Sequence, residues 1–207
     1  MALITKGGTK QIRTNFNEHE LRSRSWEKGF LDAPESFELS DITLDGMQII
    51  RNYYNVPMIP SSTLRSDLHN SLTPGASSGS FHKLKNGKVH AVDWEFEDQD
   101  IEGSEGYNAS IDYYNQMKNK SGALYSQLKA IGVNGIGLYD NFNHTDSRSY
   151  TAFWDNSTKK KSYIEAITST YSNNEDGYID WSNSIITTSI IIVVLIVLLI
   201  WWFKFKK

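Results

Sequence analysis

Residues 80–93 read SFHKLKNGKVHAVD and place an Asn-Gly pair in the middle of a short polar segment. Asn86-Gly87 suits a two-residue type I′ turn, because both central positions of that turn need a positive φ. Lys85 and Lys88 flank the pair, and the residues on both sides alternate in character. The segment therefore predicts a β-hairpin in which Lys85 faces Lys88.

The register of this hairpin would bring two potential metal ligands together. His82 would face Ala91 and Ser80 would face Asp93, and these four side chains would share one face while His90 points to the other. His82 and Asp93 would be diagonal neighbours, about 7–8 Å apart at the backbone. The small Ala91 would leave room for an ion between them. Polar pairs are also common on solvated hairpins without any ion, so both interpretations stay open.

A further histidine is the candidate for a third ligand. His144 stands in NFNHTD (141–146), directly after GIGLY (135–139), which predicts a strand that ends in a loop. Catalytic zinc sites usually have three protein ligands and one open position. Because the chain has no cysteine, histidines and carboxylates must hold any metal. The alternative is that His144 is an ordinary loop histidine.

The rest of the chain up to about residue 155 predicts one mixed domain. Apolar residues at helical spacing indicate an amphipathic helix that starts near 43–45, and VPMI (56–59) indicates a short strand. Residues 111–131 look helical, with an interruption at the Ser-Gly pair 121–122. The expected fold class is α+β, a small antiparallel sheet with helices packed on it. A formal net charge of −3 gives no electrostatic footprint for nucleic acid.

The C-terminal end predicts a membrane anchor. The run 185–203 holds 19 residues without a charge, enough for a helix that crosses about 30 Å of hydrocarbon. The lysines that follow would keep the C-terminus in the cytoplasm and the domain outside. The N-terminus lacks an apolar stretch for a signal peptide, which would leave the domain inside, so the orientation stays open. The expected parts are an N-terminal arm (1–14), a folded domain (15–155), a polar stalk (156–184), a transmembrane helix (185–203) and a basic tail (204–207).

Four segments of the domain follow a known family pattern in the right order. They are NVPMIPSSTLRSDLHN (55–70), PGASSGSFH (74–82), AVD (91–93) and GIGLYDNFNHTDSRSYTAFW (135–154). Together they resemble the zinc D-Ala-D-Ala carboxypeptidase-like peptidases, which share their fold with Hedgehog-type domains and include phage and bacterial cell-wall peptidases. The resemblance covers about residues 15–155. The chain departs from the pattern in having four extra residues between His82 and Asp93 and in lacking an E-x-x-H motif.

The resemblance implies a role for individual residues of this chain. His82, Asp93 and His144 would be the ligands of Zn²⁺. Arg65 would donate hydrogen bonds to a substrate carboxylate or to the developing oxyanion, since a guanidinium offers fixed bidentate geometry. The remaining implied residues are Ser62 and Ser80 for substrate binding, and Asp146, ranked before Asp140, as the general base.

The resemblance also implies a function. The chain would be a membrane-anchored zinc peptidase that cuts peptidoglycan peptides as a carboxypeptidase or endopeptidase. Its short length and single anchor favour a phage virion protein that opens the wall during entry or release. The implied partners are a peptidoglycan stem peptide or cross-bridge, a lipid membrane and, in a virion, membrane or capsid proteins. The alternative is a catalytically inactive, membrane-anchored structural or wall-binding protein that reuses the fold.

Overall fold

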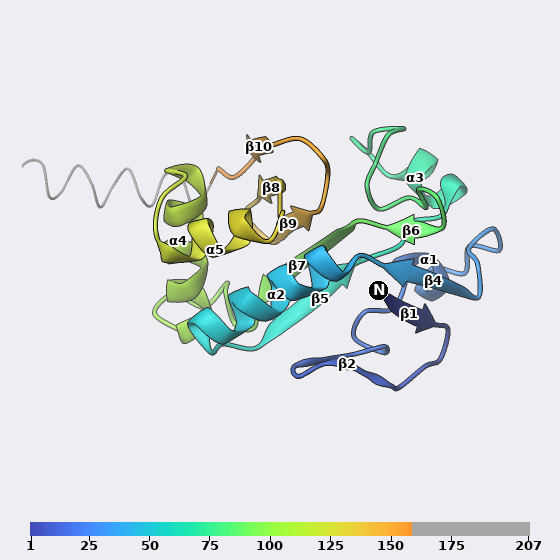
Figure 1. Cartoon of the computed structure of the whole chain (residues 1–207), viewed down its shortest axis with the longest axis horizontal. Coiled ribbons are helices and arrows are strands. Elements are labelled where there is room, and N and C mark those ends of the chain that lie inside the picture. The colour runs from blue at the N-terminus through green and yellow to red at the C-terminus, as the bar shows by residue number, and fades with distance from the viewer. Residues whose placement is uncertain (159–207) are drawn as a thin grey trace, which may run out of the picture. The chain divides into compact units, whose positions relative to one another are not determined.

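The computed structural model describes residues 1–158, whose largest element is a five-stranded sheet (Figure 1). The strands are β1 (Ala2–Thr5), β2 (Gln11–Arg13), β3 (Phe16–Asn17), β4 (Ser36–Leu39), β5 (Met58–Ser62), β6 (Lys88–Val89), β7 (Ala91–Phe96), β8 (Gly135–Leu138), β9 (Asn143–Asp146) and β10 (Ala152–Asp155). The helices are α1 (Arg24–Glu27), α2 (Asp41–Tyr54), α3 (Asp67–Leu72), α4 (Glu105–Lys118) and α5 (Ala123–Ala130).

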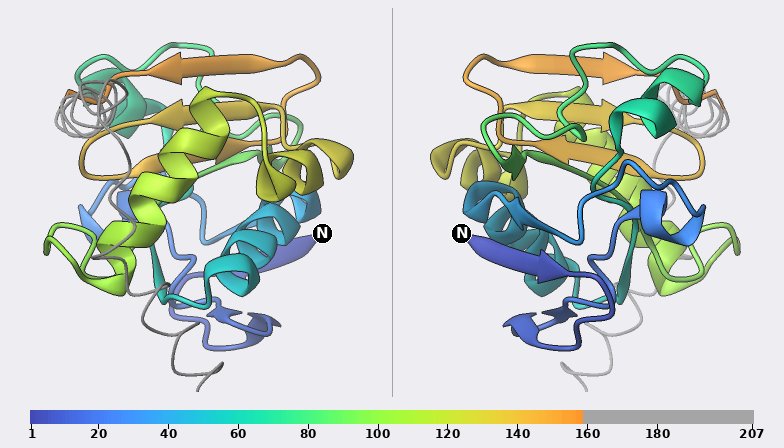
Figure 2. Two further views of the ribbon diagram at one scale, coloured as in Figure 1. Left: turned by 90° about the vertical axis from the view of Figure 1, so that its left-hand side faces the viewer. Right: turned by 90° about the vertical axis from the view of Figure 1, so that its right-hand side faces the viewer.

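The central sheet has the strand order β10-β8-β9-β7-β5. Adjacent strands in this sheet are antiparallel, except β10 and β8, which run parallel. Helices α2, α4 and α5 lie together along one face of the sheet (Figure 2), where α2 packs on β9 and α4 packs on β7. The α+β class with helices packed on a small sheet is therefore confirmed, and the opposite face of the sheet remains available for a site.

Apolar and aromatic side chains fill the space between the sheet and these helices. Trp94 of β7 and Tyr113 of α4 are fully buried, with their rings edge to face and their centroids 5.0 Å apart. Met47 of α2 and Leu128 of α5 are also fully buried. Burying one large apolar side chain contributes about 1.5–3 kcal/mol to stability. This packing holds β7 and β9 on the face of the sheet that the helices cover. Successive residues of β7 alternate between this core and the opposite face.

A smaller sheet with the order β1-β4-β6 includes the N-terminal segment. Strand β1 pairs antiparallel with β4, and Ile4 within it is fully buried. Residues 1–14, which were predicted to form an arm, thus contribute β1 and β2 to the folded part of the chain. A buried side chain in β1 indicates that the segment packs as part of the core rather than as an appendage.

The local element predictions are largely confirmed. Helix α2 covers the expected amphipathic helix, and β5 and β8 overlap the two expected strands. The helical stretch 111–131 is divided into α4 and α5 at Gly122, whose φ of +92° is one that L side chains rarely adopt. Glycine reaches this conformation without steric cost, so the chain turns at the interruption read from the sequence.

The hairpin prediction is confirmed at its turn and wrong beyond it. Lys85 and Lys88 exchange backbone hydrogen bonds of 2.8 and 3.1 Å across Asn86-Gly87, and both turn residues have positive φ. The ladder does not continue, because the N–H of His90 donates to the carbonyl of Phe81. The expected pairing of residue 82 with 91, and of 80 with 93, is therefore absent.

Long-range pairing explains this difference. Strand β7 already has a neighbour on each edge: Asp93 stands opposite Ser62 of β5 on one side and opposite His144 of β9 on the other. No edge of β7 is left for residues 80–84, which form a turn region instead. The sequence placed His144 in a loop after β8, whereas it lies in the middle of the sheet on β9.

The predicted membrane anchor lies outside the described residues. Within residues 1–158, no helix is both long and apolar enough to cross a membrane. The transmembrane helix at 185–203, the basic tail at 204–207 and nearly all of the stalk at 156–184 fall beyond this part and stay predictions.

Candidate metal centre

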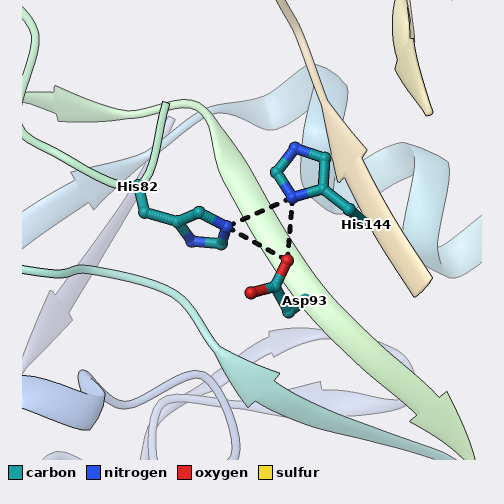
Figure 3. A group of neighbouring side chains, drawn as sticks. All are labelled: His82, Asp93 and His144. Atoms are coloured by element: carbon teal, nitrogen blue, oxygen red, sulfur yellow. Dashed lines mark hydrogen bonds and ion pairs between the residues drawn. The ribbon is translucent and has the colours of Figure 1, made fainter. Parts of the chain in front are cut away.

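Three side chains from distant parts of the chain meet on the open face of the sheet (Figure 3). Asp93 lies on β7, His144 on the adjacent β9, and His82 reaches them from the turn region before β6. His82 Nε2 is 3.1 Å from Asp93 Oδ1 and 3.2 Å from His144 Nδ1, and His144 Nδ1 is 2.8 Å from Asp93 Oδ1. All three side chains are buried, so the cluster is a preformed arrangement.

On the side of each imidazole that faces away from the cluster, a hydrogen-bond acceptor fixes which ring nitrogen carries a proton. His82 Nδ1 lies 2.7 Å from the carbonyl oxygen of Thr63, an acceptor that requires an N–H at Nδ1. His144 Nε2 lies 2.9 Å from Asp146 Oδ2, which requires an N–H at Nε2. In the neutral tautomers, lone pairs at His82 Nε2 and His144 Nδ1 therefore point toward the carboxylate of Asp93.

This convergence of lone pairs fits a metal ion. Three acceptor atoms that face one another repel unless a cation lies among them. Zinc bonds of about 2.0–2.1 Å place neighbouring ligand atoms of a tetrahedron about 3.3 Å apart. The three observed separations, from 2.8 to 3.2 Å, are close to one face of such a tetrahedron. The donor set of two imidazoles and one carboxylate is also one that zinc accepts.

The electrostatics of the cluster agree with this assignment. Burial lowers the pKa of the His82 imidazole and keeps it neutral. Burial would raise the pKa of Asp93, but the two histidines outweigh it and hold that pKa well below its usual range. Burial likewise opposes a proton on His144, yet hydrogen bonds to Asp146 and Asp93 raise its pKa. A proton on His144 and a metal ion would therefore compete for this cluster.

Arg65 holds the second oxygen of the Asp93 carboxylate, and Ser62 in turn accepts from Arg65. Arg65 Nη2 donates to Asp93 Oδ2 at 2.5 Å, and Arg65 Nε lies 3.3 Å from Ser62 Oγ. Ser62 stands opposite Asp93 in the β5–β7 ladder, so the sheet register sets this contact. Among the described residues, Arg65 Nη1 has no hydrogen-bond partner, which leaves one donor for a ligand in the cavity.

Comparison with known proteins agrees with the geometry. The sequence model of one protein family, described as Peptidase M15, matches residues 13–146. The chain belongs to the peptidase M15 family. This is a metallopeptidase family of zinc D-Ala-D-Ala carboxypeptidase-like proteins, so the resemblance read from the sequence is confirmed. No curated protein and no solved structure matches the chain.

The structure places Asp146 behind His144, a candidate metal ligand, and outside the cavity lining. Its Oδ2 accepts from His144 Nε2, on the side of the ring opposite the cluster. Arg148 donates to both oxygens of Asp146, with distances from 2.5 to 3.0 Å. The carboxylate is fully buried, and a Cβ on Gly135 would collide with it. This geometry suits a residue that orients His144, not a base that reaches a water in the cavity.

The other sequence-derived candidates divide between the cavity and its surroundings. Ser80 lines the cavity, and its Oγ accepts from the N–H of His82 at 3.2 Å. Asp140, the second candidate base, is not part of the cavity lining; it accepts from the backbone and hydroxyl of Thr158 at 2.9 and 2.7 Å. His90, which was expected to point away, lies 3.1 Å from Ser147 Oγ outside the cluster.

His82, Asp93 and His144 line a cavity of about 820 Å³. Its walls come mainly from residues 73–80, which follow α3, and from aromatic residues around β8–β10. Asp93 is the only carboxylate among the described residues that line it. The lining residues that sequence reasoning did not single out include Arg24, Tyr139, Phe142, Arg148, Tyr150 and Trp154.

A sequence signal did exist for one of these residues. Side chains two residues apart along a strand share one face, so the face that carries His144 and Asp146 continues to Arg148. The spacing H-x-D-x-R thus matches the two hydrogen bonds that the structure shows, from Arg148 to Asp146 and from His144 to Asp146. No comparable local signal marks Arg24, which reaches the cavity from α1.

Proposed function

We propose that the protein is a zinc-dependent peptidase that cuts peptides of peptidoglycan. The observation that carries this proposal is the meeting of one potential ligand atom each from His82, Asp93 and His144 in the lining of a cavity. Membership of the M15 family supports the peptidase class. The size of the cavity, about 820 Å³, supports a substrate larger than a single amino acid.

The chain's own residues would bind and polarise the substrate. A bound Zn²⁺ would supply Lewis acidity and lower the pKa of a water molecule to about 7. Arg65 lines the cavity, and its Nε and Nη2 contact Ser62 and Asp93, so Nη1 can donate to a peptide carbonyl or a terminal carboxylate. Ser80 lies at the same wall and can hydrogen-bond the peptide backbone.

The proposal extends to the place of action. The uncharged run 185–203 supports a single membrane anchor, and the lysines that follow it support a cytoplasmic C-terminus. A phage virion protein that opens the cell wall fits an anchored wall peptidase. Protease protection of the chain in membranes tests the orientation: a domain shielded from protease in sealed, right-side-out vesicles would refute the arrangement in which the domain faces the wall.

Two variants of the full-length chain, purified in detergent, test the catalytic part. We expect native protein to hold one zinc per chain and to release new amino or carboxyl ends from isolated cell walls. His82→Ala removes one ligand and should abolish both properties. His90→Ala is the matched control, since it removes a histidine eight residues away that lies outside the cluster, and it should retain both. Well-folded native protein without zinc would overturn the proposal.

A second candidate function rests on a specific observation. Metallopeptidases need a group that accepts the proton of the attacking water, and Asp93, already held by Arg65, is the only carboxylate among the described cavity residues. A wall-binding or structural protein that keeps the metal without cutting would need no such group. Stoichiometric zinc together with intact wall peptides after prolonged incubation would favour this candidate and overturn the peptidase.

A further inference from the structure

Trp154 lies flat against the sheet beside the metal ligands. It stands in register with Gly137, which stands opposite His144, so the three residues form one line across β10, β8 and β9. A Cβ on Gly137 would come within 2.4–2.6 Å of three atoms of the Trp154 ring. Because these three distances are nearly equal, the ring turns one face to Gly137. Trp154 also lines the cavity, where the guanidinium carbon of Arg148 lies 5.0 Å from the centroid of its ring.

Two more rings continue this surface. Trp154 Nε1 donates to the hydroxyl of Tyr139 at 2.8 Å, and the rings of Tyr139 and Phe142 are stacked with centroids 4.1 Å apart and planes 16° apart. All three residues are half-buried and line the same cavity. We call Tyr139, Phe142 and Trp154 the aromatic wall.

The composition of the cavity indicates what kind of group the aromatic wall would contact. Among the described lining residues none is Leu, Ile, Val or Met, and apart from a proline and an alanine the apolar lining is aromatic. A pocket for an aliphatic side chain is usually enclosed by apolar side chains of several kinds. Here flat rings stand beside polar groups instead, including the exposed Asn156 and the hydroxyl of Tyr139, which accepts from Trp154 and can still donate.

This combination matches the shape and chemistry of a sugar ring. A pyranose has a face of C–H groups that packs on an aromatic ring and a rim of hydroxyl or amide groups that need hydrogen-bond partners. The rings of the aromatic wall offer flat surfaces, and Tyr139 and Asn156 offer polar groups that line the same cavity. A tryptophan buries a large apolar area while its ring keeps a defined geometry, so such a contact is both favourable and orienting.

We propose that the aromatic wall is a saccharide-binding subsite that stacks a pyranose ring of a glycan. The inference rests on the proposed function, because the glycan is taken to be the one that carries the peptide cut by the proposed peptidase. The ring centroids of Trp154 and His144 are 5.0 Å apart, so the stacked sugar lies next to the metal centre. The substrate is therefore a peptide still joined to its glycan, and the bond that is cut lies close to the sugar.

The test uses a ligand that contains no peptide. The full chain, purified in detergent, is titrated with an N-acetylglucosamine oligosaccharide, and binding is measured by calorimetry. Phe142→Leu removes a flat ring but keeps apolar volume, and Trp154→Leu removes the central ring. We expect each to weaken binding about tenfold, equivalent to about 1.4 kcal/mol. Tyr53→Leu, at an aromatic residue outside the cavity, is the matched control and should bind like native protein.

The outcomes separate this inference from the proposed function. His82→Ala should still bind the oligosaccharide, because the aromatic wall does not depend on the metal. Sugar binding by native protein that cuts no wall peptide would overturn the peptidase and leave the saccharide subsite standing. Absence of oligosaccharide binding, or equal binding by native protein and Phe142→Leu, would overturn the subsite. If Trp154→Leu melts too low to assay, Phe142→Leu alone decides.

Discussion

Replacing Asp146 by asparagine separates two roles that this carboxylate could have. As a general base it would have to reach a water in the cavity, whereas the structure places it behind His144, paired with Arg148. Burial would raise the pKa of Asp146, but Arg148 and His144 outweigh it and hold that pKa well below its usual range. A carboxylate with such a low pKa is a poor proton acceptor near neutral pH. We therefore expect Asp146→Asn to act through metal binding.

The size of the effect follows from the contacts that change. Asp146 is fully buried, and its charge-assisted hydrogen bond to His144 Nε2 is 2.9 Å long. Loss of a partner that orients a metal-ligating histidine costs about 10- to 100-fold in metal affinity. That range corresponds to about 1.4–2.7 kcal/mol. Asparagine keeps one acceptor oxygen and the side-chain shape, so the fold should persist while Arg148 loses its charged partner.

The assay compares zinc affinity with turnover. Zinc affinity is measured by competition with a chromophoric chelator, and wall digestion is then measured at low and at saturating zinc. We expect Asp146→Asn to bind zinc about 10- to 100-fold more weakly and to recover most of its turnover at saturating zinc. Unchanged zinc affinity with turnover reduced at every zinc concentration would refute the reasoning and restore Asp146 as the general base. Asp140→Asn is the matched control and should change neither quantity.

Other perturbations have equally direct outcomes. Removing the metal with a chelator should lower the melting temperature, because zinc at a concentration about 100 times its Kd adds about 2.7 kcal/mol to the free energy of unfolding; an unchanged melting curve would argue against a bound metal. Gly137→Ala should destabilise the protein by about 1–3 kcal/mol in denaturant titrations, since the new Cβ would meet the Trp154 ring. Arg65→Lys should retain zinc but raise the KM for wall peptides about tenfold, because the ammonium group cannot hold Asp93 and a substrate in one fork. Zinc affinity should fall as the pH is lowered from about 8 to about 6: burial lowers the pKa of His144, but its carboxylate partners raise it overall, so a proton displaces the metal below that raised pKa. Titrations that show no such loss would contradict this assignment.

The sequence predicts the members of the metal cluster better than it predicts how they meet. Asn86-Gly87 specifies its turn locally, and the turn forms as expected. The contact between His82 and Asp93 is also present, but the predicted hairpin ladder is not what creates it. Hairpin reasoning considers only neighbours along the chain, whereas the partners of β7 are β5 and β9, which lie about 30 and 50 residues away in sequence. Such long-range pairing has no local signal.

For the two candidate bases, too, the spacing along the chain did not show where the side chains lie in the fold. The H-x-D spacing ranked Asp146 before Asp140, but it gave both residues the same role, that of a general base. In the structure Asp146 shares a strand face with His144 and bonds to its far nitrogen, while Asp140 lies beyond the end of β8 and bonds to Thr158. Strand alternation would have identified Asp146 as a partner of the ring once His144 was placed on a strand. The sequence placed it in a loop, so that inference was not reached.

The correction to the hairpin also explains how the chain tolerates four extra residues between two metal ligands. The position of His82 is set by its contact with the carbonyl of Thr63 and by the hydrogen bond from the N–H of Arg65 to the carbonyl of His82. Asp93 is set independently by β5 and β9. The segment between His82 and Asp93 reverses direction at the turn between Lys85 and Lys88, away from the ligand atoms. Lengthening a connection from about 7 to about 11 residues costs only about 0.4 kcal/mol of closure entropy. The ligand geometry is thus uncoupled from the length of the segment that joins the ligands.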